Sequence, residues 1–283
     1  MAAPDHGMNT TAPATPAAWE PLTPRGVAGF ARAPWWRLLL VQLVVAMAAA
    51  GVTGWFLMED WVPVVHAAIR HLPDQGEIRN QQLYWRGSSP VKLAGNRFLG
   101  LGVDLDHTGQ LARDSQVQVE FGRRNLFIIV SPVRTSMDYP AGWQIAFNRP
   151  ELDSRWGAWE PPLLVITALV MVAGLMIIWA LLATIYCLPV RLITLYEDRD
   201  LNWVQSWRLA GAALMPGALF LTFAMLLYAL GSLTLLELGL AWALHLVIGW
   251  IYLFISPFFI ARHPSAEVAR GNPFAPGRKK GGK

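Results

Sequence analysis

Long apolar stretches alternate with charged segments along the chain, and this pattern predicts its main elements. Four stretches contain no charged side chain: residues 38–58, 161–190, 209–236 and 238–261. Each has the roughly 20 residues that a helix needs to cross the hydrocarbon core of a bilayer. We therefore predict transmembrane helices at residues 38–58, 163–188, 209–231 and 239–260.

The interval 59–160 has a different pattern, in which apolar and polar residues alternate over short runs. Runs rich in aromatic and β-branched residues lie at 82–86, 116–121, 125–131 and 143–147. This composition and this period of two favour strands. The tight connection GRR at 122–124 predicts a hairpin between the second and third runs. We expect a small, mostly antiparallel sheet.

A helical period appears in residues 60–72, DWVPVVHAAIRHL, where the apolar residues fall on one helical face. We predict a short amphipathic helix that lies on the membrane and closes the sheet. His66 and His71 lie on this helix, but a spacing of five does not place two metal ligands on one face, so they are interpreted as solvent or interface residues. The predicted fold class is a membrane all-α bundle of four transmembrane helices with an α+β domain, residues 59–160, inserted between the first two helices.

Lys and Arg residues beside the apolar stretches predict the orientation in the membrane, because basic side chains resist translocation. They cluster before residue 38, in the loop 189–208 and in the tail 261–283, whereas the loop between the third and fourth helices has Glu237 as its charged residue. Both ends are therefore predicted to be cytoplasmic, with the α+β domain on the other side. Trp156 and Trp159 are interpreted as anchors at the membrane interface.

Composition supports a membrane protein and removes other classes. Of the 283 residues, 54% are hydrophobic and 15% are charged, which is too apolar a balance for a soluble chain of this length. The net charge of +4 follows the predicted topology, so nucleic acid is not an expected partner. The single cysteine, Cys187, cannot form an internal disulfide. Residues 1–33 are predicted to be a disordered cytoplasmic segment, since their start is rich in Ala, Pro and Thr.

The segment 102–109, GVDLDHTG, is the most conspicuous candidate for chemistry. Its apolar run ending in Asp-x-Asp-x-Thr resembles the nucleophile motif of haloacid-dehalogenase-type phosphatases. The resemblance implies that Asp104 attacks phosphorus and that Asp106 acts as acid and base, with a metal ion neutralising charge. The other motifs of those enzymes do not follow in this sequence, and the domain is too short for their fold.

Two other interpretations of this segment are open. Asp104, Asp106 and Thr108 have the spacing of a calcium loop, but Ser115 stands where a bidentate Glu is needed. The interpretation that we favour is a strand ending in a turn, in which Asp106 and Thr108 bond to the backbone and Gly109 has a positive φ. The sequence thus predicts no metal site and no cofactor.

Within the predicted helices, His245 is the intramembrane polar candidate, because ionisable side chains in a bilayer mark ion or proton paths. A proton-coupled carrier normally needs more than one such histidine. We therefore expect His245 to form a hydrogen bond with a neighbouring helix. The sequence also lacks the HExxH, P-loop and dinucleotide-binding glycine motifs that mark several large enzyme classes.

Several segments occur in a characteristic order: GEIRNQQLYWRG at 76–87, Pro90, FLGLGVDLDHTG at 98–109, VQVEFGRRNLFIIV at 117–130 and WVQSWRLAGAALMPGAL at 203–219. This order resembles a family of bacterial polytopic membrane proteins of unknown function. Some of its members are described as maltodextrin-utilisation membrane proteins, and the family is related to the Yip-type membrane proteins. The resemblance runs from about residue 33 to residue 260 and implies a multi-pass protein of the bacterial cytoplasmic membrane, without an established activity.

The sequence favours a non-enzymatic envelope protein whose external domain acts as a sensor, a scaffold or an accessory subunit. This hypothesis rests on a discrete external domain without a set of catalytic residues. A permease or transporter component is the alternative. An extracytoplasmic hydrolase that uses Asp104 and Asp106 is the second alternative. The expected partners are the lipid bilayer and either a membrane protein or a second copy of the chain.

Overall fold

The computed structural model describes residues 20, 22–109, 111, 114–130, 133–199 and 201–262. The predictions for residues 1–19 and for the tail beyond residue 262 lie outside this part of the chain. The chain divides into two compact units. Unit 1 comprises Met1–Val45, Met176–Leu221 and Ala241–Lys283, and unit 2 comprises Ala46–Leu175 and Thr222–Leu240.

The part of the chain that the structure describes contains four helices long and apolar enough to cross a membrane: Trp35–Arg70, Arg149–Tyr196, Trp203–Ala229 and Leu235–Phe259. They lie where the uncharged stretches predict them. The second, α4 (Arg149–Tyr196), has 48 residues, whereas the sequence prediction gave it residues 163–188. At 1.5 Å per residue it is about 70 Å long, roughly twice the thickness of a hydrocarbon core.

The first long helix is also extended beyond its predicted end. It consists of α2 (Trp35–Phe56), the π-helical turn η1 (Leu57–Trp61) and α3 (Val62–Arg70). The amphipathic segment predicted at 60–72 therefore continues the first helix instead of forming a separate element on the membrane. Its apolar residues Val64, Ala68 and Ile69 are buried.

Unit 1 contains a short N-terminal helix, α1 (Pro24–Phe30), so the prediction of disorder up to residue 33 is wrong for this segment. Thr23 caps the helix, since its hydroxyl accepts a hydrogen bond from the Gly26 N–H at 3.0 Å. Val27 and Phe30 are buried in one apolar cluster with Leu209 of α5 (Trp203–Ala213). The burial of these apolar side chains offsets the entropy of ordering the segment.

The third long helix is interrupted near its proline. Helix α5 ends at Ala213, and α6 (Met215–Ala229) begins after a break at Leu214. Pro216 lies just after this break and lacks the N–H that a continuous helix needs. At Gly217, a Cβ atom would lie 2.4 Å from the His245 carbonyl oxygen of α7 (Leu235–Ile255), so glycine permits a close approach of the two backbones.

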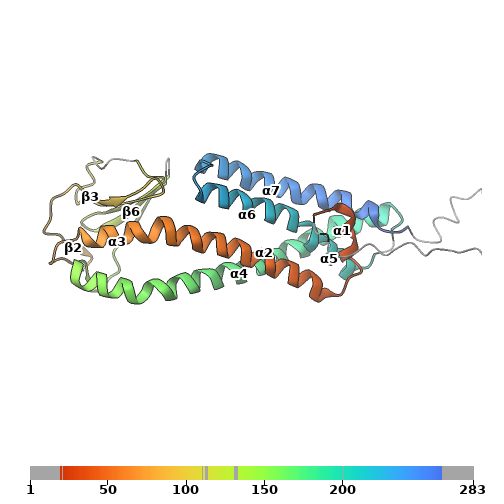
Figure 1. Cartoon of the computed structure of the whole chain (residues 1–283), viewed down its shortest axis with the longest axis horizontal. Coiled ribbons are helices and arrows are strands. Elements are labelled where there is room, and N and C mark those ends of the chain that lie inside the picture. The colour runs from red at the N-terminus through yellow and green to blue at the C-terminus, as the bar shows by residue number, and fades with distance from the viewer. Residues whose placement is uncertain are drawn as a thin grey trace, which may run out of the picture. The chain divides into compact units, whose positions relative to one another are not determined.

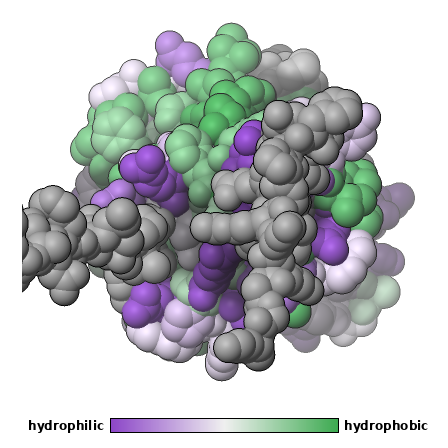
Figure 2. Space-filling model, turned by 90° about the vertical axis from the view of Figure 1, so that its right-hand side faces the viewer, coloured by the Kyte–Doolittle hydropathy of each residue, from purple (hydrophilic) through white to green (hydrophobic). Residues whose placement is uncertain are grey.

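Arginines of unit 1 bind backbone carbonyl groups near the helix ends. Arg208 donates to the Ala33 oxygen at 2.8 Å, Arg199 donates to the Ile260 oxygen, and Arg191 donates to the Leu201 oxygen. Figure 2 views the molecule from the side of α1 and α5 and shows hydrophilic residues among hydrophobic ones on this face. The basic residues that predict orientation thus also satisfy terminal carbonyl groups.

Unit 2 contains two sheets where the sequence predicts one (Figure 1). The smaller has the order β2-β1-β8, and the larger has the order β3-β4-β5-β6-β7. Their strands are β1 (Glu77–Arg79), β2 (Gln82–Tyr84), β3 (Val91–Gly95), β4 (Leu99–Val103), β5 (Val117–Phe121), β6 (Asn125–Val130), β7 (Val133–Asp138) and β8 (Ile145–Ala146).

The pairing of these strands confirms the predicted hairpin and adds one parallel pair. Strands β5 and β6 are antiparallel, with Val117 opposite Val130 and Phe121 opposite Leu126. Strands β4 and β5 are parallel, with Leu99 opposite Val117 and Val103 opposite Phe121. Helix α3 covers this fold, and its Ala68 shares an apolar core with Leu93 of β3.

Candidate functional site

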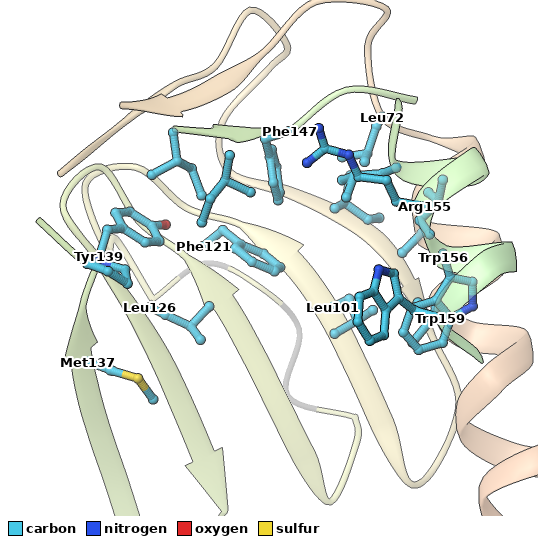
Figure 3. Close-up of a pocket in the computed structure, with 18 of the residues that line it drawn as sticks. Leu72, Leu101, Phe121, Leu126, Met137, Tyr139, Phe147, Arg155, Trp156 and Trp159 are labelled. Atoms are coloured by element: carbon cyan, nitrogen blue, oxygen red, sulfur yellow. The ribbon is translucent and has the colours of Figure 1, made fainter. Parts of the chain in front are cut away.

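Unit 2 has an apolar cavity of about 520 Å³, open on one side, between its sheets, α3 and the first part of α4 (Figure 3). This volume lies within the roughly 300–1,000 Å³ that is typical of small-molecule sites. Asp138 and Arg155 are the two charged residues among those that line it. The cavity therefore has the chemistry of a site for an apolar group.

The two helices contribute matching stripes to the cavity wall. Helix α3 supplies Val65, Ala68 and Ile69, and Leu72 follows just after the helix ends at Arg70. The three helical positions follow the spacing i, i+3 and i+4, so they lie on one helical face. Helix α4 supplies Leu152, Arg155, Trp156 and Trp159, which extend the same spacing to i+7.

The larger sheet forms the facing wall, and each of its strands contributes an apolar side chain: Leu93, Leu101, Phe121, Leu126 and Met137 in the order of the strands. Figure 3 shows Leu126 and Phe121 toward one side of the cavity, the indoles of Trp156 and Trp159 at the other, and Leu101 next to the indoles in this view. Apolar residues from elements far apart in the sequence therefore converge on one volume.

Besides the charged residues, the wall contains the polar groups of Tyr139 and Trp156. The Tyr139 hydroxyl donates a hydrogen bond to the Gly122 carbonyl oxygen at 2.9 Å, and burial raises the pKa of this hydroxyl. The indole Nε1 of Trp156 is buried and has no hydrogen-bond partner in the described part of the chain. An unpaired buried donor is costly, so a ligand atom that accepts from Trp156 would gain binding free energy.

The structure places Asp104 in a closed turn after β4. Asp104 is fully buried, and its Oδ2 accepts hydrogen bonds from the Thr108 hydroxyl at 3.0 Å and from the Gly109 N–H at 3.1 Å. Burial opposes ionisation of this carboxyl, but the hydrogen bonds from Thr108 and Gly109 outweigh it, so the pKa is lowered. A buried carboxylate that accepts these bonds stabilises the turn.

Asp106 has a different environment from Asp104. Its side chain is 70% exposed, and its Oδ1 accepts a hydrogen bond from Arg123 at 3.2 Å. Gly109 has the predicted positive φ, at 71°. We predicted that the Asp106 and Thr108 side chains bond to the backbone. Instead, Asp104 accepts a hydrogen bond from the Gly109 N–H, Thr108 donates to Asp104, and Asp106 pairs with Arg123.

Among the residues that the structure describes, no group of three or more His, Cys, Asp or Glu side chains is placed to hold a metal ion. Ser115, at the last position of the calcium-loop spacing, donates to the Asn96 carbonyl oxygen at 2.5 Å. His66 of α3 instead pairs with Glu160 of α4, with 2.7 Å between Nε2 and Oε2.

His245 lies in unit 1. The contacts that the structure gives for it are with Trp242 of the same helix. Its ring Nδ1 forms a hydrogen bond with the Trp242 carbonyl group of its own helix, so the predicted bond to a neighbouring helix is wrong. Glu237 completes the N-terminal cap of α7, because its carboxylate accepts from the Thr234 N–H at 2.6 Å and the Thr234 hydroxyl at 2.9 Å.

Sequence reasoning missed the cavity, although part of its signal is present in the chain. We interpreted Trp156 and Trp159 separately, as interface anchors. Together with Leu152 they follow the helical spacing i, i+4 and i+7, so the three side chains form one apolar face. The facing strand residues are brought together only by tertiary structure. The chain matches no protein-family model, no curated protein and no solved structure.

Proposed function

We propose that this chain is a multi-pass protein of the bacterial cytoplasmic membrane whose α+β domain binds the apolar chain of an amphiphile outside the cytoplasm. The protein acts as a binding or sensing component and not as an enzyme. The single observation that carries this proposal is the apolar cavity of about 520 Å³ in unit 2. Its lining offers a place for methylene groups, each worth about 0.8 kcal/mol when removed from water.

The position of the cavity along the helices supports a ligand that comes from the bilayer. Its α4 stripe, from Leu152 to Trp159, directly precedes the uncharged stretch 161–190 of the same helix. Its α3 stripe likewise continues the helix whose apolar stretch is 38–58. Indole side chains favour the membrane–water interface, and Trp159 is 60% exposed. An acyl chain that leaves a leaflet there reaches the cavity without crossing bulk water.

The distribution of basic residues supports the orientation in this proposal, with both termini in the cytoplasm. We also propose that the chain belongs to the family of bacterial polytopic membrane proteins that its sequence resembles. The proposed partners are the lipid bilayer and a membrane protein or second copy that receives the binding signal.

Orientation has its own test. In a Cys187→Ala background, Ser154→Cys places a thiol on the exposed first part of α4, and Val204→Cys places one at the start of α5. We expect a membrane-impermeant maleimide to label the first in intact spheroplasts and the second only after lysis. The reverse pattern would overturn the proposed orientation.

Photolabelling tests the binding function directly. The full-length protein in phosphatidylcholine nanodiscs is irradiated with a long-chain alcohol that carries a diazirine in its chain, and cross-linked peptides are mapped by mass spectrometry. Ala68→Phe projects a ring into the cavity, whereas Ala67→Phe places the same ring on a neighbouring position of α3 that does not line it. The two substitutions change helix propensity equally.

We expect labels on the strands that face the cavity, and a several-fold loss of these labels in Ala68→Phe but not in Ala67→Phe. Labels on the apolar stretch of α4 report contact with bilayer lipid and should be equal in all three proteins. Equal strand labelling in both variants, or no strand labelling in the wild type, would overturn the proposed function.

A further inference from the structure

We propose that the amphiphile carries an anionic head group, which binds in a second, polar pocket on the other side of the smaller sheet. This inference rests on the proposed function, because it takes the apolar chain to occupy the cavity described above. It adds the chemical class of the ligand and names the residues that recognise it.

The polar pocket has a volume of about 800 Å³ and belongs to unit 2. It is lined by the smaller sheet, the segment before it and the start of α4, with side chains that include Glu77, Arg79, Tyr84, Arg86, Gln144 and Asn148. Charged and amide groups of this kind bind a head group and do not attract an alkyl chain.

The smaller sheet separates the two pockets as a partition one strand layer thick. Ile78 of β1 and Ile145 of β8 line the apolar cavity, whereas their neighbours Glu77, Arg79 and Ala146 line the polar pocket. This alternation follows from the period of two in a strand, which sends successive side chains to opposite faces. One short sheet therefore presents an apolar surface to one volume and a polar surface to the other.

Arg155 of α4 is the residue that lines both volumes. Figure 3 shows its side chain at the margin of the apolar cavity. Its Nη2 lies 3.2 Å from Glu151 Oε2, and the two side chains are 57% and 54% exposed. Such an exposed pair is weak, and a guanidinium has five N–H donors, so Arg155 retains donors for a ligand anion at the junction.

Arg86 is a second arginine of the polar pocket that can bind an anion. Arg79 pairs with Glu77 at 3.1 Å, whereas Arg86 donates to the neutral Gln75 side chain and forms no ion pair with another described residue. An arginine whose partner is neutral gains a charge-assisted hydrogen bond when it meets a carboxylate or a phosphate. Asp74 lines the same pocket and can accept from head-group hydroxyl groups.

Two sources provide this chemistry. A fatty acid has its carboxylate directly at the end of the chain, so it reaches Arg155 at the junction. A monoacyl glycerol phosphate extends its anion further and reaches Arg86 as well. In both cases the anion lies on the polar side of the partition while the chain lies on the apolar side.

The experiment compares three diazirine probes that share one chain and differ in the head: a fatty alcohol, a fatty acid and a monoacyl glycerol phosphate. Full-length protein in phosphatidylcholine nanodiscs is labelled with each probe over a range of concentrations. The variants are Arg155→Gln, Arg86→Gln and the control Arg123→Gln. The control removes an arginine from the same domain that lines neither pocket.

We expect at least one anionic probe to label the cavity strands at about tenfold lower concentration than the alcohol, as one charge-assisted interaction provides. Arg155→Gln should remove this advantage, so that the anionic probes label the cavity strands no better than the alcohol does. Labelling of this variant by the alcohol shows that its cavity is still folded. If Arg86→Gln also removes the advantage of the phosphate probe, the ligand has the extended head group. If only Arg155→Gln has an effect, the ligand is a fatty acid. Arg123→Gln should match the wild type.

The possible failures are distinguishable. If the alcohol labels the cavity but the anionic probes have no advantage, or if Arg155→Gln leaves that advantage intact, the head-group proposal is wrong and the proposed function stands. If none of the three probes labels the cavity strands, the proposed function itself is wrong.

Discussion

The two faces of the β4–β5 pair have opposite chemistry and teach different lessons about the sequence. One face presents Leu101 and Phe121 to the apolar cavity. The other presents the buried polar side chains Gln118 and Glu120, which share a hydrogen bond of 3.2 Å. Glycines on β4 lie opposite these two residues and leave room for them. The same ten strand residues thus support a ligand-sized cavity on one side and a closed polar layer on the other.

The polar face is closed by the segment that follows β4. A Cβ atom on Gly102 would lie 2.9 Å from Leu111 Cδ1, and one on Gly100 would lie 2.8 Å from Ser115 Oγ. At these two positions, side chains of the segment pack directly against the strand backbone. The conspicuous motif GVDLDHTG therefore holds the fold together, whereas the inconspicuous apolar residues of the same strands form the candidate site.

The largest effect that separates these roles is expected at the two aspartates of the motif. Asp104→Asn replaces a buried ionised acceptor of two hydrogen bonds and should lower the free energy of unfolding by roughly 1.5–3 kcal/mol. Asp106→Asn changes an exposed side chain and should cost less than about 0.5 kcal/mol. Pulse proteolysis of the full-length protein in detergent measures both values. Equal stabilities would contradict the structural role of Asp104.

A pH titration sharpens the same contrast. Because the folded-state pKa of Asp104 is lowered, its stabilising contribution is complete above the ordinary value of 3.8 and is lost as the pH falls through the lower folded-state pKa. Wild-type stability should therefore decline more steeply with acid below about pH 5 than that of Asp104→Asn. Denaturation midpoints of the two proteins between neutral and acid pH check this slope. Parallel curves would show that another carboxyl dominates the acid response.

A smaller effect is expected on the apolar face. Leu101 is half-buried beside the cavity, whereas Val103 on the same strand is fully buried. Leu101→Ala should cost about 1 kcal/mol, below the 2–5 kcal/mol that is typical of an enclosed leucine, because its side chain already borders open volume. Val103→Ala removes fewer atoms but should cost at least as much. A larger loss in Leu101→Ala than in Val103→Ala would indicate that the cavity is closed in solution.

The sequence predicted those features that are encoded locally. Uncharged stretches such as 161–190 predicted the apolar helices, and GRR at 122–124 predicted the β5–β6 hairpin. The break in the third long helix is equally local, because it lies beside Pro216. Each of these depends on a single segment and its own hydrogen-bond requirements.

The remaining features depend on tertiary contacts that the sequence pattern does not carry. Helix α1 is ordered because Val27 and Phe30 find an apolar cluster elsewhere in unit 1. The β4–β5 pair is parallel, so it cannot be formed by a local hairpin, which is the strand pairing that a single segment encodes. The cavity requires Leu126 of a strand and Trp156 of a helix to face one another, and neither residue is unusual in its own segment.

The most direct measurement of the central claim is native mass spectrometry of the full-length protein released from its own membranes. We predict that the wild type retains one single-chain amphiphile per protein molecule, that Ala67→Phe retains it too, and that Ala68→Phe loses it. Retention by Ala68→Phe at the wild-type level, or a wild-type protein that carries no such molecule while its bulk lipids are still bound, would contradict the assignment of the cavity as a ligand site.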